Sequence, residues 1–241
     1  MRLDKLLSNM GFGSRKEVRQ FLKNGVVRVN GETEKKSGAI INTQTYSVTL
    51  LGEPVVYREF IYLMMNKPQG VLSATEDSRD KTVVDLLSSD FSHFNPFPVG
   101  RLDKDTEGFL LLTNDGKLAH NLLSPKKNVP KTYYAHIAGA VTNEDVESFQ
   151  NGVTLDDGYK TKSGELRILK TGETSEIELT ITEGKFHQVK RMFEAVDKKV
   201  VYLKRLSMGP LSLDEELSLG TYRELTQEEV EVLYQTSNTY L

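Results

Sequence analysis

A charged segment that leads directly into an apolar run constrains this 241-residue chain more than any other feature of its sequence. Residues 100–108 read GRLDKDTEG, and residues 109–112 read FLLL. Burying an unpaired charge costs several kcal/mol, so these charges need partners wherever the chain folds them inward. The apolar run predicts a buried strand that holds the charged segment tightly against a core. Rigid polar segments of this kind often contain catalytic or binding residues. The alternative is that residues 100–108 form an ordinary surface turn.

The composition excludes several classes of protein. The chain has no cysteine, which excludes disulfides, thiolate nucleophiles and cysteine-ligated zinc. Its four histidines are scattered without the spacing of a metal site. The first residues lack the long apolar segment of a secretory signal, and no run approaches the length of a membrane span. A cytoplasmic protein with no membrane partner is expected.

The distribution of charge is more informative than its sum. The net charge of −3 argues weakly against a nucleic-acid partner. However, residues 1–30 contain seven basic and two acidic side chains, and residues 185–205 again contain seven against two. The compensating acidic residues lie largely within residues 214–231. A protein polarised in this way can present positive faces to phosphates.

The first basic block predicts two short helices followed by a strand. Leucines recur at helical spacing from Leu3 onward, and residues 11–13 (GFG) break that helix. Ser14 and Glu17 have the spacing of a capping box at the start of the second helix. Residues 26–29 predict a strand, which ends in a tight turn at residues 30–31 (NG).

The rest of the chain mixes strands and helices without strict alternation. Strands are predicted at residues 60–65, 108–113, 131–137, 176–182 and 200–206, and helices at 116–123, 143–151, 187–196 and 227–234. This irregular order indicates an α+β fold with a mainly antiparallel sheet. A boundary expected at residues 54–59 gives two domains, 1–58 and 59–241.

Four ordered segments carry a resemblance to a known enzyme family. They are NKPQGV at residues 66–71, GRLD at 100–103, KTY at 131–133 and EGKFHQVKRM at 183–192. Together they resemble the RNA pseudouridine synthases, most closely the branch that includes the small-subunit (16S) ribosomal RNA enzyme. The N-terminal block resembles the S4 RNA-binding domain. The resemblance implies a small S4-like α/β domain, then a catalytic domain whose mixed, mainly antiparallel sheet is crossed by the RNA cleft.

The resemblance implies isomerisation of a single uridine in small-subunit ribosomal RNA. The bond from N1 to the ribose breaks, the uracil turns, and C5 bonds to the same sugar carbon. Nothing is oxidised and no group is lost, so neither a cofactor nor a metal is expected. The expected partner is 16S RNA or a ribosome assembly intermediate, bound by a monomer. The alternatives are a synthase acting on 23S RNA and a non-catalytic RNA-binding or ribosome-assembly protein.

The resemblance also assigns roles to three residues. Asp103 corresponds to the aspartate that every pseudouridine synthase uses, whether it attacks the sugar, adds to the uracil or removes a sugar proton. Lys190 corresponds to its ion-pair partner, which keeps the carboxylate ionised. Tyr133 corresponds to the tyrosine that stacks on the uracil and assists removal of the C5 proton. Asp105 and Glu107 are rivals within the motif, for which salt bridging or turn capping is the favoured interpretation.

Further residues are predicted to contact RNA. Arg101 corresponds to the family arginine that fills the gap left when the uridine leaves its stack. Lys190 and Arg191 face about 100° apart on a helix, so only one should point toward the aspartate. Lys67, Pro68 and Gly70 are expected to shape the cleft floor. The remaining predicted RNA-binding residues are Arg2, Arg15, Lys16, Arg19 and Lys23 in the first basic block and Lys185, His187, Gln188 and Arg191 in the second.

A phosphotransferase of the haloacid dehalogenase group is a further possibility, because Asp103 and Asp105 form an Asp-x-Asp pair. That signature follows a hydrophobic strand and has Thr or Val two places after its second aspartate. Here residues 98–101 (PVGR) precede the pair, and Glu107 stands at the decisive position. The phosphotransferase interpretation therefore fails on both requirements.

Overall fold

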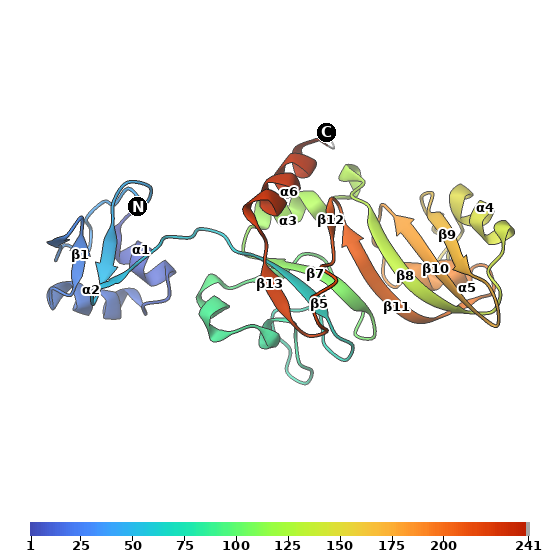
Figure 1. Cartoon of the computed structure of the whole chain (residues 1–241), viewed down its shortest axis with the longest axis horizontal. Helices are drawn as coiled ribbons and strands as arrows, with labels where there is room; N and C mark the ends of the chain where they lie inside the picture. Colours follow the sequence, from blue (N-terminus) through green and yellow to red (C-terminus); the bar gives the residue numbers. More distant parts are fainter. Residues whose placement is uncertain (240–241) are drawn as a thin grey trace. The chain divides into compact units, whose positions relative to one another are not determined.

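The computed structural model describes residues 1–239 and divides the chain into two compact units (Figure 1). The first unit consists of Met1–Ile61 and Leu87–Pro96, and the second of Tyr62–Leu86 and Phe97–Leu241. Within the described residues, no helix is long and apolar enough to cross a membrane.

The first unit packs two helices against a small antiparallel sheet with strand order β2-β1-β3-β4. Leucines and valines from both layers form its core, which is separate from the core of the second unit. Its elements are α1 (Leu3–Asn9), α2 (Arg15–Lys23), β1 (Val27–Val29), β2 (Glu32–Thr33), β3 (Val48–Leu50) and β4 (Glu53–Pro54).

The local signals predicted in this unit are confirmed. Ser14 and Glu17 form the capping box of α2, with the Glu17 carboxylate accepting from the Ser14 backbone N–H at 2.7 Å. Asn30 and Gly31 both have positive φ, 51° and 85°, as a type I′ hairpin turn between β1 and β2 requires. The Asn-Gly pair therefore turns the chain where the sequence predicts.

The second unit is built on a nine-stranded sheet with the order β13-β5-β7-β11-β8-β10-β9, to which β6 and β12 add short pairings. Among the pairings described, β7 and β11 run parallel and the others antiparallel, which confirms a mixed, mainly antiparallel sheet. The strands are β5 (Tyr62–Lys67), β6 (Phe97–Pro98), β7 (Glu107–Thr113), β8 (Lys131–Ala138), β9 (Glu165–Lys170), β10 (Thr174–Ile181), β11 (Lys199–Met208), β12 (Leu211–Ser212) and β13 (Tyr222–Glu224).

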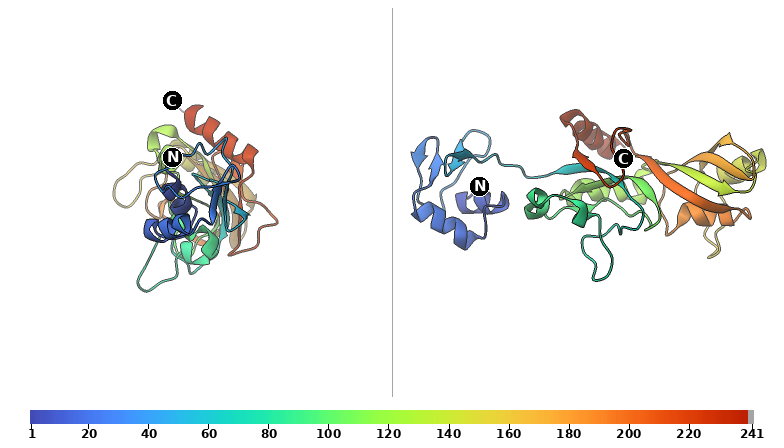
Figure 2. Two further views of the ribbon diagram at one scale, coloured as in Figure 1. Left: turned by 90° about the vertical axis from the view of Figure 1, so that its left-hand side faces the viewer. Right: turned by 60° about the horizontal axis from the view of Figure 1, so that its bottom comes forward.

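Helices cover the two ends of this sheet separately. Near β5 and β7, α3 and α6 lie side by side, and Phe109 of β7 shares a core with Leu118 of α3 and Leu233 of α6 (Figure 1). Near β8 to β9, α4 and α5 meet through Phe149 and Phe193, whose ring centroids are 4.8 Å apart. Figure 2 shows the ribbon of this part of the second unit from two further sides. These helices are α3 (Gly116–Leu123), α4 (Asn143–Asn151), α5 (Gln188–Glu194) and α6 (Gln227–Thr239).

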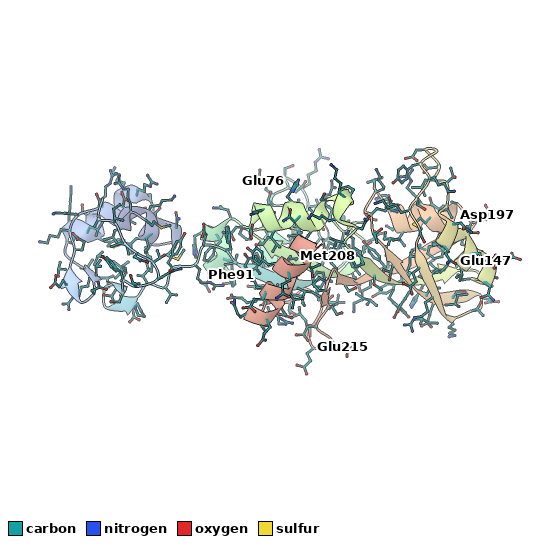
Figure 3. All side chains as sticks on the ribbon, turned by 90° about the horizontal axis from the view of Figure 1, so that it is seen from above. Glu76, Phe91, Glu147, Asp197, Met208 and Glu215 are labelled. Atoms are coloured by element: carbon teal, nitrogen blue, oxygen red, sulfur yellow. The ribbon has the colours of Figure 1, made fainter. Side chains whose placement is uncertain are left out.

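Three side chains of the second unit illustrate its buried and its exposed positions. Met208, at the end of β11, is buried in the body of the second unit, whereas Glu147 and Asp197 project outward at its far end (Figure 3). Short 3-10 helices complete the chain at Val84–Leu86, Ser89–Phe94 and Pro125–Lys127.

The predicted strands and helices of the second unit are present, with ends shifted by a few residues, but β6, β9, β12 and β13 were not predicted. The helix predicted at residues 187–196 is shorter, because His187 adopts a left-handed conformation (φ 49°) and α5 starts at Gln188. The helix predicted at 227–234 continues to Thr239. β9 escapes detection because it is an edge strand that is mostly exposed and rich in charge, so no clear apolar alternation marks it.

Gly108 allows the parallel contact at the centre of the sheet. It pairs with Arg205 of β11 and has φ +102°, a backbone conformation that side chains rarely adopt. A Cβ at this position would overlap the carbonyl oxygen of Arg205 and lie 2.9 Å from its backbone nitrogen. A glycine is thus required for two strands distant in sequence to meet here.

We expect Gly108→Ala to lower the free energy of unfolding by about 3–5 kcal/mol, because backbone strain and overlap with β11 add together. Chemical denaturation followed by circular dichroism measures this loss. Gly139→Ala is the matched control, since Gly139 also has positive φ (+98°) but nothing within 4 Å of the added Cβ. Equal losses in the two variants would mean that the close approach of β7 and β11 contributes nothing.

Candidate active site

The charged segment 100–106 is a rigid loop between β6 and β7. Val99 N–H donates to the carbonyl of Leu111 at 2.7 Å, which aligns the entry of the loop with β7. The Ser73 hydroxyl donates to the Leu102 carbonyl and accepts from the Leu102 N–H, both at 3.0 Å. Gly70 N–H donates to the Lys104 carbonyl at 2.7 Å. The backbone on either side of Asp103 is therefore held by hydrogen bonds from a second loop.

Lys67 holds this loop by hydrogen bonds to its backbone carbonyls. Its side chain is fully buried at the end of β5, and its ammonium donates to the carbonyls of Pro68, Asp103 and Thr106 at 3.0–3.1 Å. A fourth carbonyl, that of Lys104, lies 3.5 Å away. Burial lowers the pKa of Lys67 to about 8, against the opposing effect of nearby carboxylates, so the ammonium stays charged at neutral pH. Lys67 thus holds the backbone of the loop, and its expected part in shaping the cleft floor stays a prediction.

Asp103 and Lys190 form an ion pair, and Asp105 shares it. Lys190 Nζ lies 3.1 Å from Asp103 Oδ2 and 2.7 Å from Asp105 Oδ1. The side chain of Asp103 is 25% exposed and that of Asp105 68%, so Asp103 is the more sheltered of the two carboxylates. His187 Nε2 lies 3.5 Å from Asp103 Oδ1 on the other side. Glu107 instead accepts a hydrogen bond from Tyr202, away from this cluster.

The electrostatics keep Lys190 and Asp105 in their ionised forms. Burial alone would lower the pKa of Lys190, but hydrogen bonds to Asp105 and Asp103 outweigh it and raise the pKa above its usual value. The hydrogen bond from Lys190 likewise lowers the pKa of Asp105, more than partial burial raises it. Lys190 is thus a permanent cation at neutral pH, placed between two carboxylates.

Tyr133 lies across a cavity from Asp103. The cavity has a volume of about 320 Å³, and Arg101, Asp103 and Tyr133 are among the residues that line it. Tyr133 occupies a buried position of β8, while the next residue, Tyr134, lies on the opposite face and donates to Glu176 at 2.7 Å. Tyr133 and Asp103 therefore border the same cavity, and Tyr134 is not among its lining residues.

The predicted RNA-binding residues of the second basic block fall into different environments. Lys185 is exposed at the cavity, with its ammonium 4.5 Å from the ring centroid of Tyr159. Gln188 is buried and donates to Glu183 at 2.5 Å, so its amide holds the fold together. Arg191 pairs with Asp156 and Asp157 and faces away from Asp103. Lys190 and Arg191 thus point in different directions, with Lys190 toward the aspartate.

The residues predicted from the first basic block all belong to the first unit. Arg2 pairs with the buried Asp4 at 2.8 Å, and Arg19 lies 3.8 Å from the same carboxylate. Arg15, Lys16 and Lys23 are exposed on α2. Arg2 is therefore partly neutralised within its own unit, and the α2 side chains present the larger share of open positive charge.

Two buried cations at the cavity received no role from the sequence. Lys131 and Arg205 are 7% and 2% exposed, respectively, and both line the cavity beside Tyr133. Lys131 begins the KTY segment, so its position was within a recognised motif. Arg205 closes the second basic block, where nothing in the sequence separates a buried arginine from a solvent-facing one. Among the described residues, no group of three or more His, Cys, Asp or Glu is placed to hold a metal ion.

Comparison with known proteins agrees with this geometry. A family model described as RNA pseudouridylate synthase matches residues 61–195, more than half of the chain. The chain belongs to this family. The resemblance carried by its four motifs is thereby confirmed, and the chain is an RNA pseudouridine synthase. A model of the S4 domain matches residues 1–44 of the synthase.

Relatives of this pseudouridine synthase span nearly its whole length. It is 60% identical to an RNA pseudouridine synthase of Bacillus subtilis over 97% of this chain and 98% of that one. It is 40% identical to the ribosomal small subunit pseudouridine synthase A of Vibrio vulnificus, over 97% and 100% of the two chains. It is 39% identical to the ribosomal large subunit pseudouridine synthase B of Bacillus subtilis, over 96% and 95%.

A solved structure supports the fold in the same way. The crystal structure of a pseudouridylate synthase is 35% identical and aligns with a TM-score of 0.68, covering 97% of this chain and 99% of that chain. The S4 domain followed by a synthase fold with a mixed sheet is therefore shared along the length of both proteins.

We expect Lys67→Met to lower the free energy of unfolding of the synthase by about 2–4 kcal/mol, because several buried carbonyls lose their donor. Lys104→Met is the control: Lys104 pairs with the half-exposed Asp80 at 2.7 Å, and loss of a surface ion pair costs less than about 1 kcal/mol. Urea denaturation compares the two variants. Similar losses would show that the carbonyls around Lys67 need no cation.

Proposed function

We propose that this pseudouridine synthase isomerises one uridine of small-subunit (16S) ribosomal RNA, with Asp103 as the catalytic carboxylate. The observation that carries the assignment of Asp103 is its position: it is paired with Lys190, and it borders the cavity that Tyr133 also lines. Of the three acids in the motif, Glu107 is engaged by Tyr202 and Asp105 is mostly exposed.

The reaction needs little beyond these side chains. The N1–C1′ bond breaks, a C5–C1′ bond forms, the proton at C5 leaves and N1 gains a proton, so the atoms balance without a co-reactant. Attack on the sugar, addition to the uracil and removal of a sugar proton all begin from an ionised carboxylate at the nucleoside. The Lys190 ammonium, 3.1 Å from Asp103, would hold this carboxylate in place by an ion pair. Stacking on Tyr133 would hold the uracil while permitting it to rotate.

The RNA contacts complete the proposal. Arg101, exposed at the cavity, is proposed to occupy the space that the flipped uridine vacates, with Lys185, His187 and Arg191 contacting the surrounding strand. We propose residues 1–58 as the RNA-binding domain and 59–241 as the catalytic domain of a monomer that acts in the cytoplasm. Arg2, Arg15, Lys16, Arg19 and Lys23 would contact phosphates.

The proposal that 16S RNA is the substrate rests on similarity to relatives, and the same relatives suggest a second candidate substrate. The small-subunit enzyme of Vibrio vulnificus supports 16S RNA at 40% identity. The large-subunit enzyme of Bacillus subtilis, at 39%, makes 23S RNA the second candidate. The two candidate functions predict different losses in cells that lack the protein: a pseudouridine of 16S RNA for the first and a pseudouridine of 23S RNA for the second.

We expect cells lacking this protein to lose one pseudouridine of 16S RNA, as mapped by carbodiimide modification and primer extension. The parent protein and Asp105→Asn should restore it. Asp103→Asn should not, because its neutral amide replaces the catalytic carboxylate, with a loss of turnover of about 10³-fold or more. Restoration by Asp103→Asn together with failure of Asp105→Asn would move the catalytic role to Asp105. Loss of a 23S pseudouridine instead would select the second candidate.

We expect removal of residues 1–58 to weaken RNA binding and to flatten its dependence on salt by about two to four units in the log–log slope, because each phosphate contact contributes roughly 0.7–0.9. Affinity for a 16S RNA fragment across a salt series measures the slope for both proteins. Asp103, Tyr133 and Lys190 lie outside the removed segment, so slow turnover should persist at low salt and high RNA concentration. An unchanged slope would show that the first domain makes no phosphate contacts.

A further inference from the structure

Two cations lie at the floor of the cavity on adjacent strands. Lys131 and Tyr133 are two residues apart on β8, so their side chains share a face of the sheet. Arg205 of β11 is paired directly with Tyr133. Both cations are therefore neighbours of Tyr133, Lys131 along β8 and Arg205 across from it on β11, and all three residues line the cavity.

Neither cation has a carboxylate partner within residues 1–239. Lys131 Nζ donates to the Val129 carbonyl at 3.0 Å, and Arg205 Nε donates to the Phe109 carbonyl at 2.8 Å. Arg205 Nη2 is buried and has no hydrogen-bond partner. The hydroxyl of Thr106, which lines the same cavity, is also buried without a partner. Two polar groups at this cavity, Arg205 Nη2 and the Thr106 hydroxyl, are thus without a hydrogen-bond partner.

Three other buried or partly buried cations of the second unit are compensated. Lys67 is surrounded by carbonyls, Lys190 by two carboxylates, and Lys198 pairs with Asp145 at 2.8 Å. Lys131 and Arg205 instead repel each other: burial, reinforced by the charge of Arg205, lowers the pKa of Lys131 to about 8. Buried like charges without a counterion are unfavourable, so an anion is the ligand that this floor fits.

We propose that Lys131 and Arg205 form a phosphate subsite, which binds the backbone phosphate of the target nucleotide while its uracil stacks on Tyr133. Arginine and lysine are the side chains that bind phosphate, arginine through its planar fork and lysine as a point charge. A uracil carbonyl is neutral and would leave both charges uncompensated. The nature of the anion rests on the proposed function, because it is taken to be an RNA phosphate.

The first test measures melting temperature in potassium phosphate against potassium chloride at equal ionic strength. Phosphate should stabilise the parent protein more than chloride does, because binding to the folded state alone raises its stability. Lys131→Met should melt a few degrees higher than the parent in chloride, since the repulsion is removed, and should lose most of the phosphate-specific shift.

The matched control is Lys198→Met, which removes a cation that is paired. This variant should melt lower than the parent, because it leaves Asp145 without its partner, and should keep the full phosphate-specific shift. A lower melting temperature in Lys131→Met with an unchanged phosphate response would overturn the inference and make Lys131 a structural residue.

The second test distinguishes phosphate from uracil recognition. Uridine 5′-monophosphate should bind the parent about tenfold or more tightly than uridine, as measured by NMR titration, and this ratio should approach one in Lys131→Met. Arg205→Lys, which keeps the charge and removes the fork, should reduce the ratio only partly. Equal binding of the two ligands to the parent protein, with both weakened in Arg205→Lys, would assign the cations to the uracil and overturn the phosphate subsite.

These measurements separate the inference from the proposed function. The phosphate response requires no turnover, so a protein that leaves 16S RNA unmodified but keeps the response retains the anion site and loses only the RNA assignment. Conversely, a protein that restores the 16S pseudouridine but shows no phosphate-specific shift keeps its function and loses the subsite.

Discussion

The contact between the Lys67 ammonium and the carbonyls of the loop at residues 103–106 is the interaction on which the site depends. β5 pairs with β7 along its whole length, so the end of β5 brings this ammonium directly beneath the loop that precedes β7. The carbonyls turn inward toward the lysine, and the side chain of Asp103 is consequently left facing the cavity and Lys190. A loop held only by its two ends would not fix the aspartate in this way.

The cations of the site differ in what compensates them, and this difference separates their roles. Lys67 faces carbonyl dipoles and holds the backbone. Lys190 faces two carboxylates, those of Asp103 and Asp105. Lys131 and Arg205 each donate to a single backbone carbonyl and have no carboxylate partner among the described residues, and we propose that their charge is available to a ligand. A count of basic residues along the chain treats all four alike, although their partners give them distinct chemistry.

Several elements of the fold can be predicted from local sequence patterns. Other features of the fold and of the site depend on contacts between segments that are distant in the sequence. The capping box at Ser14, the Asn-Gly turn and the apolar strand after Gly108 are local signals, and the structure contains all of them. The sharing of Lys190 between Asp103 and Asp105 depends on how α5 meets the loop, which no local pattern encodes. The burial of Arg205 depends on the pairing of β11 with β7 and β8. β9 was not predicted because it lacks the apolar alternation by which strands are recognised.

The parallel pairing of β7 with β11 also determines the order in which parts of this sheet and site can form during synthesis of the chain. Glu107 and Gly108 meet Lys204 and Arg205, so the centre of the sheet joins segments that are synthesised almost a hundred residues apart. Contacts of such long sequence separation form slowly, because the intervening chain must first be closed into a loop. The loop that bears Asp103 leaves the ribosome long before Lys190 and Arg205 do. A nascent chain therefore contains Asp103 before it contains Lys190 and Arg205, so the ion pair between Asp103 and Lys190 cannot form until α5 has been synthesised.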